Sequence, residues 1–207
     1  AQLRRYVDLE RLRGLGAPIV VDTMHGAGYG YLSALLREQG LEVIEVRAEP
    51  RPDFGGGAPE PIARNLRPAR AAVIVHGAAA GLCVDGDADR VAAIDEEGAV
   101  IDAQRVFALL LSHLYRARGQ RGSVVKTFAG SRMIDRLAER FGLPFRETPV
   151  GFKHVCRWAL REHVLIGGEE SGGIGFGDHM PERDGILGNL LLLEAMVMRG
   201  RSLRQLL

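Results

Sequence analysis

The sequence has little cysteine, almost no lysine and no long apolar run. Its two cysteines, Cys83 and Cys156, lie among apolar neighbours without a C-x-x-C spacing, so we expect two buried thiols rather than a disulfide or a thiolate metal site. The longest apolar stretch, from Ile186 to Met198, is interrupted by glycine, asparagine and glutamate. It is too short to span a bilayer, so we expect no membrane contact.

A strong charge of one sign is also missing. The formal net charge is +1, and no basic block is interleaved with aromatic residues, so we expect no nucleic-acid partner. Residues 1–13 are charged throughout and lack the apolar core of a signal peptide, which makes the cytoplasm the expected compartment. Lysine occurs only at Lys126 and Lys153. We ascribe this bias to codon usage, but only an amine can lose its proton when buried.

Patterns typical of strands and helices alternate along the chain. Short apolar runs indicate strands, and apolar residues at helical spacing indicate helices. We expect strands at residues 18–21, 41–46, 72–75, 81–84, 91–94, 124–125, 145–150 and 164–166. We expect helices at residues 31–36, 106–114, 133–141 and 153–162, another from about residue 184, and a short one after the Pro- and Gly-rich connector at 50–61.

This alternation predicts sheets covered by helices, because each strand must bury its apolar side chains against another layer. The residues from Gly98 onward indicate a boundary. We therefore expect an α/β protein with two consecutive domains, residues 1–102 and 103–207, each a mixed sheet covered by helices. A chain of 207 residues with 46% apolar content is long enough for two such cores.

The most informative segment is the acidic run Asp85-Gly86-Asp87-Ala88-Asp89-Arg90, which lies between two predicted strands. In extended backbone, alternate residues share a face, so the carboxylates of Asp85, Asp87 and Asp89 can converge. Carboxylates that close repel one another unless a cation lies between them, and oxygen ligands favour Mg²⁺, Mn²⁺ or Ca²⁺ over zinc. The adjoining Arg90 would hold a phosphate oxygen beside the metal.

The acidic run has two other interpretations, an EF-hand calcium loop and a solvated acidic turn. An EF-hand also begins D-x-D-x-D, and Glu96 is at its twelfth position. Its sixth position must be glycine, however, and here it is Arg90. A solvated turn is the usual role of a short charge run, but the tight spacing and the adjoining arginine favour a metal site.

A second segment, Gly167 to Gly173, surrounds Glu169, Glu170 and Ser171 with four glycines. Glycines let the backbone approach a ligand closely. Because Glu169 and Ser171 alternate, we expect them to face one way and to hydrogen-bond neighbouring hydroxyls of a sugar, with Glu170 facing the other way. The alternative is an ordinary hairpin loop with exposed acids.

Three further side chains are candidates for the same cleft. Lys153 lies in the first turn of a predicted helix, where the helix dipole favours anions, so its ammonium would assist an anionic ligand. His179 and Arg183 lie in a charged segment that would line the cleft, and a surface position is the alternative for all three. The turn Asp22 to Gly28 lacks both G-x-G-x-x-G and the Walker lysine, so we interpret it as structural.

Four segments together resemble the α-D-phosphohexomutases, the superfamily of phosphoglucomutase, phosphomannomutase and phosphoglucosamine mutase. They follow the order of that family and are Val21–Gly28, Asp85–Arg90, Thr148–Lys153 and Gly168–Gly173. The resemblance extends over essentially the whole chain but covers only the middle two of four domains. It implies that a first domain with a phosphorylated serine and a fourth domain with a phosphate-binding loop are missing, so that the chain alone would be inactive.

The resemblance implies a Mg²⁺-dependent relay, in which the phosphoserine donates its phosphoryl group to a sugar monophosphate and the resulting bisphosphate returns the other one. By position, Arg90 would orient the transferring group, and Glu169 and Ser171 would bind the sugar hydroxyls in either orientation. Lys153 would be an acid/base group or a phosphate contact. The metal ligands would be Asp85, Asp87 and Asp89.

One departure from the family pattern bears on the sugar. Phosphomannomutase-like and glucosamine-type members typically have histidine after the Ser-Gly of this loop, whereas this chain has Gly173. The stretch from His179 to Gly185 also looks more like that of a phosphoglucomutase. Glucose phosphate is therefore the expected substrate, with mannose and glucosamine phosphates as alternatives.

The sequence leaves two other functions open. A phosphatase of the haloacid dehalogenase kind also uses aspartates and Mg²⁺, but its nucleophile lies in a D-x-D-x-T or D-x-D-x-V pattern after the first strand. This chain has Asp22-Thr23-Met24 at that place. The other alternative is a non-catalytic module that binds a sugar phosphate or a metal at this length.

Overall fold

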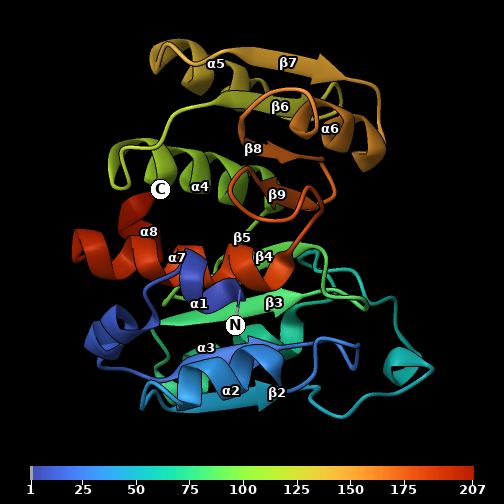
Figure 1. The fold of residues 1–207 in the computed structure, drawn as a ribbon. Helices are drawn as coiled ribbons and strands as arrows, with labels where there is room; N and C mark the ends of the chain where they lie inside the picture. The colour runs from blue at the N-terminus through green and yellow to red at the C-terminus, as the bar shows by residue number, and fades with distance from the viewer. Residues whose placement is uncertain (1) are drawn as a thin grey trace.

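The computed structural model describes residues 2–207 and places them in two mixed sheets that are stacked with helices between and around them (Figure 1). Each sheet combines parallel and antiparallel pairs of strands. Each is flanked by helices. The predicted fold class, two α/β units in sequence, is confirmed.

The first sheet has five strands in the order β2-β1-β3-β4-β5. The pairs β1–β2 and β1–β3 are parallel, and the pairs β3–β4 and β4–β5 are antiparallel. The strands are β1 (Ile19–Asp22), β2 (Val43–Val46), β3 (Ala80–Val84), β4 (Val91–Ile94) and β5 (Val100–Ile101). The turn from β3 into β4 is the acidic run, as the sequence predicts.

Side chains of the central strands are buried on both faces of this sheet. On one face, Cys83 packs in a cluster with α3 (Arg67–His76). On the other face, Leu82 packs with α2 (Tyr31–Arg37) and the 3-10 helix η1 (Leu9–Leu15). Burial on both faces explains why these strands form continuous apolar runs in the sequence rather than alternating ones.

The second sheet has four strands in the order β7-β6-β8-β9. The first three are parallel, and β9 pairs antiparallel with β8. The helix α6 covers one face, and α4 and α5 lie on the other. The elements are α4 (Ala103–Arg116), β6 (Ser123–Thr127), α5 (Arg132–Arg140), β7 (Phe145–Thr148), α6 (Phe152–Ala159), β8 (Val164–Gly168) and β9 (Ile174–Phe176).

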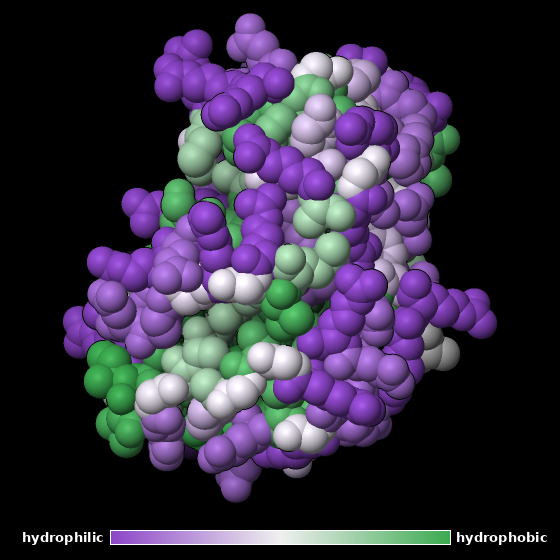
Figure 2. Space-filling view, turned by 90° about the vertical axis from the view of Figure 1, so that its left-hand side faces the viewer, coloured by the Kyte–Doolittle hydropathy of each residue, from purple (hydrophilic) through white to green (hydrophobic). Residues whose placement is uncertain are grey.

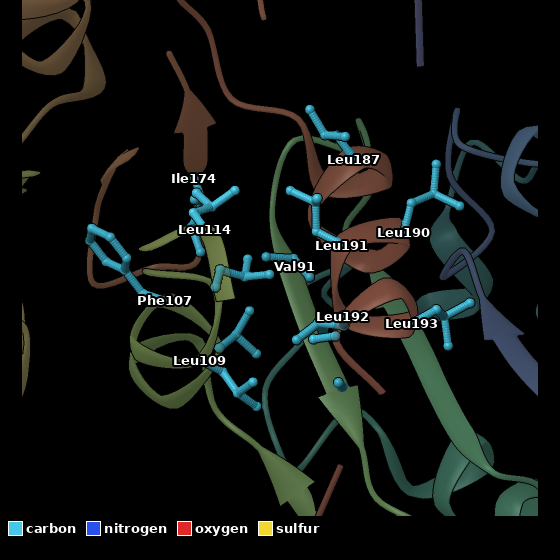
Figure 3. Close-up of a cluster of buried hydrophobic side chains, with 14 of the residues drawn as sticks. Val91, Phe107, Leu109, Leu114, Ile174, Leu187, Leu190, Leu191, Leu192 and Leu193 are labelled. Atoms are coloured by element: carbon cyan, nitrogen blue, oxygen red, sulfur yellow. The ribbon is translucent and has the colours of Figure 1, made fainter. Parts of the chain in front are cut away.

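The helix α7 (Gly185–Arg199) belongs to the second half of the sequence but packs on the first sheet. It contacts β3, β4, η1 and α4 and lies between the two sheets (Figure 1). Its residues 190–193 are all fully buried, as expected of a helix that is apolar all round. Figure 3 shows Leu191 and Leu192 beside Val91 of β4, with Leu109 of α4 opposite. One apolar core therefore runs through both halves.

One predicted strand is wrong. Residues 72–75 belong to α3, which ends at Gly77 in the left-handed conformation with φ of 58°. The run of alanine and β-branched residues is typical of a strand. In the structure, however, Ala69 and Val73 are fully buried whereas Val75 is exposed, which is the spacing of one helix face rather than of a strand.

The sequence patterns also do not indicate several short elements, because a few residues carry no readable periodicity. Among them, β9 and β5 complete the two sheets as antiparallel edge strands. The others are α1 (Gln2–Tyr6), η1, η2 (Phe54–Gly56) and α8 (Leu203–Leu206). The helix from about residue 184 is confirmed, since Asp184 caps α7.

The surface is mainly polar. Figure 2 shows one face of the molecule, on which hydrophilic residues predominate and apolar ones gather chiefly in the lower half. The most exposed large apolar side chains, Tyr31, Val75 and Leu160, lie on three different helices or their ends, which is ordinary for a folded surface. Within residues 2–207, no helix has the length and apolar character needed to cross a membrane.

Both cysteines are free thiols in the described part of the chain. Cys83 is fully buried, as predicted, whereas Cys156 is only half-buried. Burial raises the pKa of both thiols, which disfavours the reactive thiolate form.

Candidate functional site

The acidic run forms a tight loop between β3 and β4. Asp85 is buried, and its Oδ1 accepts hydrogen bonds of 3.0 Å from the backbone N–H groups of both Asp89 and Arg90. Ala88 has a left-handed conformation with φ of 64°, which folds the run back on itself. As a result, one carboxylate oxygen from each of Asp85, Asp87 and Asp89 lies within 4.8 Å of the others.

The electrostatics of the loop fit a divalent cation. Burial, together with the neighbouring carboxylates of Asp89 and Asp87, raises the pKa of Asp85 to about 6. Burial also raises the pKa of Asp89. Asp89 Oδ1 is buried and has no hydrogen-bond partner among residues 2–207. Three converging carboxylates, one with a spare buried oxygen, are oxygen donors of the kind that Mg²⁺ and Ca²⁺ prefer, and the raised pKa values reflect the repulsion and burial that a cation would relieve.

Arg90 lies beside the cluster, as predicted. Its Nε is 3.0 Å from Asp85 Oδ2 and 3.9 Å from Asp89 Oδ1. The side chain is 32% exposed, so part of the guanidinium faces solvent. It can therefore contact an anionic ligand that approaches the loop.

The turn from Asp22 to Gly28 supports the acidic loop from behind. The N–H of Ala27 donates to the carbonyl of Gly86 at 2.8 Å, and a Cβ on Gly26 would overlap the Gly86 backbone. The buried carboxylate of Asp22 holds the turn by accepting from the N–H of Met24 and pairing with Arg47. The turn thus has the structural role that the sequence indicates.

The glycine-rich loop follows β8 and leads into β9. Glu169 is buried there, and its Oε1 accepts a hydrogen bond of 3.0 Å from the N–H of Gly151. Glu170 turns the other way and accepts a hydrogen bond of 2.8 Å from the hydroxyl of Thr127. Ser171 is exposed at the tip. The two acids therefore have different partners, and of the two only Glu169 is itself buried.

The two loops meet although they come from different sheets. Arg90 and Gly173 form an antiparallel bridge, and the N–H of Val91 donates to the carbonyl of Gly172 at 3.0 Å. The N–H of Gly185, at the start of α7, donates to the carbonyl of Ala88 at 3.0 Å. Main-chain hydrogen bonds thus fix the acidic loop, the glycine-rich loop and the start of α7 against one another.

Arg183 and Lys153 lie next to this junction. Arg183 Nη2 is 2.6 Å from Asp89 Oδ2, and Arg183 Nη1 is 3.4 Å from Glu169 Oε2. Lys153, in the first turn of α6, is exposed. Both side chains line an open cavity of about 650 Å³, whose other lining residues include Gly151, Phe152, Glu169 and Glu182. The structure thus brings Lys153, Glu169 and Arg183 together.

His179 does not line that cavity. Its Nε2 is 2.9 Å from Asp184 Oδ2, and its ring packs edge-on against Tyr6 at a centroid distance of 5.9 Å. The side chain is only 3% exposed. Because Asp184 also caps α7 through the N–H of Leu187, His179 supports the start of that helix.

The structure shows three supporting residues for which the sequence gives little or no signal. Gln104 of α4 donates to the carbonyl of Glu169 at 3.4 Å and accepts from the N–H of Ser131 at 2.6 Å. Thr127 anchors Glu170, as described above. Asn189 of α7 donates to the carbonyl of Cys83 at 3.2 Å. Only Asn189 has a sequence signal, since it is an amide inside a leucine-rich helix.

The two halves of the chain match two domains of one protein family. Residues 1–98 match the phosphoglucomutase/phosphomannomutase alpha/beta/alpha domain II, and residues 102–207 match alpha/beta/alpha domain III of the same family. A phosphoglucomutase/phosphomannomutase from Thermococcus kodakarensis is 37% identical over 205 residues, which are 99% of this chain and 45% of that protein. The chain thus spans less than half the length of this relative.

Solved structures give the same result. A Thermus thermophilus protein described as a phosphomannomutase superposes with a TM-score of 0.91 at 42% identity, over 99% of this chain and 47% of that one. An N-acetylphosphoglucosamine mutase from Aspergillus fumigatus, solved with GlcNAc-6P and magnesium, shares the fold with a TM-score of 0.72 at 20% identity, over 96% of this chain and 50% of that one. The chain therefore belongs to the phosphoglucomutase/phosphomannomutase family and comprises its second and third α/β/α domains.

Proposed function

We propose that this chain is the central part of a Mg²⁺-dependent phosphohexomutase that interconverts the 1- and 6-phosphates of a hexose. The observation that carries the proposal is the main-chain junction between the acidic loop and the glycine-rich loop. It brings a cluster of three carboxylates next to Glu169, Arg183 and the cavity that Lys153 lines. A metal site beside an open cavity that can admit a sugar phosphate suits transfer of a phosphoryl group to a sugar hydroxyl.

Asp85, Asp87 and Asp89 would hold the metal. A bound Mg²⁺ would neutralise negative charge on the phosphoryl group during its transfer. Arg90, part of whose guanidinium faces solvent, would orient that group by donating to its oxygens. The backbone turn at Asp22 to Gly28 keeps the loop in place, so its carboxylates need not reorganise for each turnover.

Glu169 and Ser171 would bind the sugar, and Lys153 would contact its phosphate or act as the acid/base group. Glu169 is held by the Gly151 N–H, so its second oxygen is oriented toward Arg183 and the cavity. Lys153 lies in the first turn of α6, where the helix dipole adds to its attraction for an anion. The sugar phosphate could bind in two orientations, with its 1-position or its 6-position toward the metal, and use the same protein contacts in both, as a mutase requires.

Glucose phosphate is the sugar we favour. The names of the similar proteins include phosphoglucomutase, phosphomannomutase and N-acetylphosphoglucosamine mutase, so they do not select one sugar. Position 173 is glycine, and the side chain of Arg183 passes directly over it. The sugar pocket is therefore bounded by Arg183 rather than by a side chain from position 173.

The phosphoryl donor would be a phosphoserine in a domain outside this chain, and a fourth domain would complete the phosphate site. The lengths of the matched proteins agree with such additional domains. We expect the 207 residues alone to be inactive in turnover but able to bind Mg²⁺.

The test is to supply the complete protein that contains this segment with glucose 1-phosphate, a trace of the bisphosphate and Mg²⁺, and to measure glucose 6-phosphate. The mannose and glucosamine phosphates serve as comparison substrates. Faster conversion of either comparison substrate would overturn the choice of glucose. Tight binding of glucose 1-phosphate by the isolated chain, with no turnover in the complete protein, would favour a binding module over an enzyme.

A further inference from the structure

One side chain connects the two loops of the site. Arg183 forms ion pairs with Asp89 of the acidic loop and with Glu169 of the glycine-rich loop. The side chains of Arg183, Asp89 and Glu169 are 29%, 18% and 8% exposed, respectively. Because they are shielded from most of the solvent, their charges act on one another more strongly than charges on an open surface.

The space for Arg183 depends on a glycine. A Cβ on Gly173 would overlap Arg183 Cδ, while the other atoms near that Cβ lie at 3.2 Å or more. Gly173 does not have the left-handed backbone conformation that excludes other residues. The guanidinium also lies over the ring of Phe152, 5.6 Å from its centroid. Glycine at position 173 is thus required for the side chain of Arg183 and not for the backbone.

Arg183 competes with a metal ion for the same carboxylate. Asp89 contributes an oxygen to the acidic cluster, and its Oδ2 is already paired with Arg183 Nη2. A divalent cation in the cluster would lower the negative potential at Asp89. The attraction between Asp89 and Arg183 would then weaken, whereas that between Arg183 and Glu169 would persist.

We propose that Arg183 is a positioning residue that couples metal binding at the acidic loop to the placement of Glu169 in the glycine-rich loop. Without a divalent cation it neutralises Asp89, and with one it turns toward Glu169 and the open cavity, where an anionic sugar ligand would meet it. By linkage, each binding event changes the affinity for the other by the same factor. The inference rests on the proposed function, because it requires the metal site.

The experiment is calorimetric titration of the protein with Mg²⁺ and with Mn²⁺. Arg183→Met removes the competing charge and should bind either ion about five- to tenfold more tightly. Gly173→Ala, which displaces the arginine without removing it, should shift the affinity in the same direction. In the Arg183→Met background, Gly173→Ala should have no further effect, because the two changes act through one side chain.

Arg37→Met is the matched control. Arg37 also forms an ion pair, with Glu45 at 2.7 Å, but at the edge strand β2 and at the C-terminal end of α2, away from the acidic loop. Its replacement removes the same charge from the protein and should leave the metal affinity unchanged. Thermal melting of each variant shows that the fold is retained.

A second measurement follows Glu169 directly. The N–H of Gly151 donates to Glu169 Oε1, so its amide resonance reports on the placement of Glu169. Addition of Mg²⁺ should shift this resonance in the parent protein and leave it in place in Arg183→Met. A loss of structure alone would not produce this difference.

The experiment distinguishes failure of the proposed coupling from failure of the proposed metal site. Equal metal affinity in the parent protein and both single variants would overturn the coupling and leave the metal site intact. Absence of metal binding in all of them would overturn the metal site itself, and the coupling with it. An Arg37→Met variant that matches Arg183→Met would show that only net charge matters, which also overturns the coupling.

Discussion

At the residue scale, the acidic loop is arranged so that protons would compete with the proposed metal ion for the same carboxylates. The loop is built by main-chain hydrogen bonds to Oδ1 of Asp85, whereas Oδ2 lies 3.0 Å from Arg90 Nε. Burial raises the pKa of this carboxyl to about 6. A carboxyl with a raised pKa favours its neutral form in the folded protein, so this contribution to stability is present at low pH and is lost as the pH rises through about 6.

This competition predicts how Mg²⁺ stabilises the protein at different pH. Mg²⁺ at about tenfold its Kd should add about 1.4 kcal/mol to the stability of the protein and so raise its melting temperature. Because a metal ligand must be ionised, this rise should be complete at about pH 7.5. It should fall as the pH is lowered through about 6. Differential scanning fluorimetry from about pH 5 to 8 measures it. A rise that is the same at both ends of this range would contradict the assignment of Asp85 as a ligand.

A second prediction concerns Asp87, the exposed member of the cluster. If the proposed function holds, Asp87→Asn in the complete protein should lower the mutase activity at fixed Mg²⁺ by about 10²-fold or more, because one charged ligand of the proposed metal is replaced by a neutral one. Its thermal stability without metal should not fall, because Asp87 is exposed. Unchanged turnover in a steady-state assay would rule out the metal assignment.

The residues of the site were predictable where their signal is local. Asp85, Asp87 and Asp89 are separated by single residues, so their carboxylates stay close in any compact conformation of the run. The backbone itself is a turn with Ala88 in the left-handed conformation, and not the extended segment that the alternation predicts. The ion pair of Asp89 with Arg183 joins positions far apart in the chain and depends on how α7 packs on the first sheet. No spacing rule contains that information. Likewise, His179 has the residue type of a site residue but is packed against Tyr6.

At the scale of elements, α7 connects the second half of the chain to the acidic loop. Its cap, Asp184, accepts from the N–H of Leu187 at 2.8 Å, and its first residue, Gly185, contacts the loop directly. The buried Asn189 one turn later binds the end of β3. The first two turns of α7 thus support the acidic loop together with the Asp22 to Gly28 turn.

Gly185→Ala tests this support. Alanine favours a helix more than glycine does by about 1 kcal/mol, but a Cβ here would overlap the carbonyl of Arg90. We therefore expect a net loss of about 1–3 kcal/mol in the free energy of unfolding, together with weaker Mg²⁺ binding. Urea denaturation and calorimetry measure the two effects.

Gly14→Ala is the control for that variant. A Cβ on Gly14 would make only an ordinary contact with Val197 at 3.9 Å, so this change should cost little and should leave Mg²⁺ binding unchanged. If Gly185→Ala behaves in the same way as Gly14→Ala, the close contact at Gly185 is not important for the loop.

The elements that the sequence predicted are those with a readable period or a clear cap. Strand β4 and helix α5 are examples, and in the structure the side chain of Ser131 caps α5. Residues 72–75 were predicted wrongly because β-branched residues favour strands locally, and only packing against the first sheet places them in α3. Strand β9 has three residues, too few for a pattern, and it exists because it pairs with β8.

At the scale of the whole molecule, one core and one buried ion cluster bind the two halves together. Burial alone would raise the pKa of Glu194 in α7, but hydrogen bonds from Arg118 and His113 lower it to about 2. Arg118 also donates to the carbonyl of Tyr6 at 2.7 Å. These contacts join the N-terminal segment, α4 and α7, so the halves should not unfold separately.

Cooperative unfolding can be tested with the single tryptophan. Trp158 lies in α6 of the second half, whereas Leu36 is fully buried in α2 of the first half. Leu36→Ala should lower stability by about 2–5 kcal/mol and shift the Trp158 fluorescence transition as much as the circular dichroism transition. Val75→Ala, at a position that is 76% exposed, is the control. A fluorescence transition that does not move would show two independent units.

The placement of α7 limits how this protein can be divided or recombined. A gene segment that ends between the two sheets would encode a first sheet without the helix that covers it, leaving the buried face of β3 and β4 in water. Exchange of a single domain between members of this family would therefore expose that apolar face unless α7 were transferred with the first sheet. The two sheets and α7 thus form one folding unit, and any division of the chain has to keep them together.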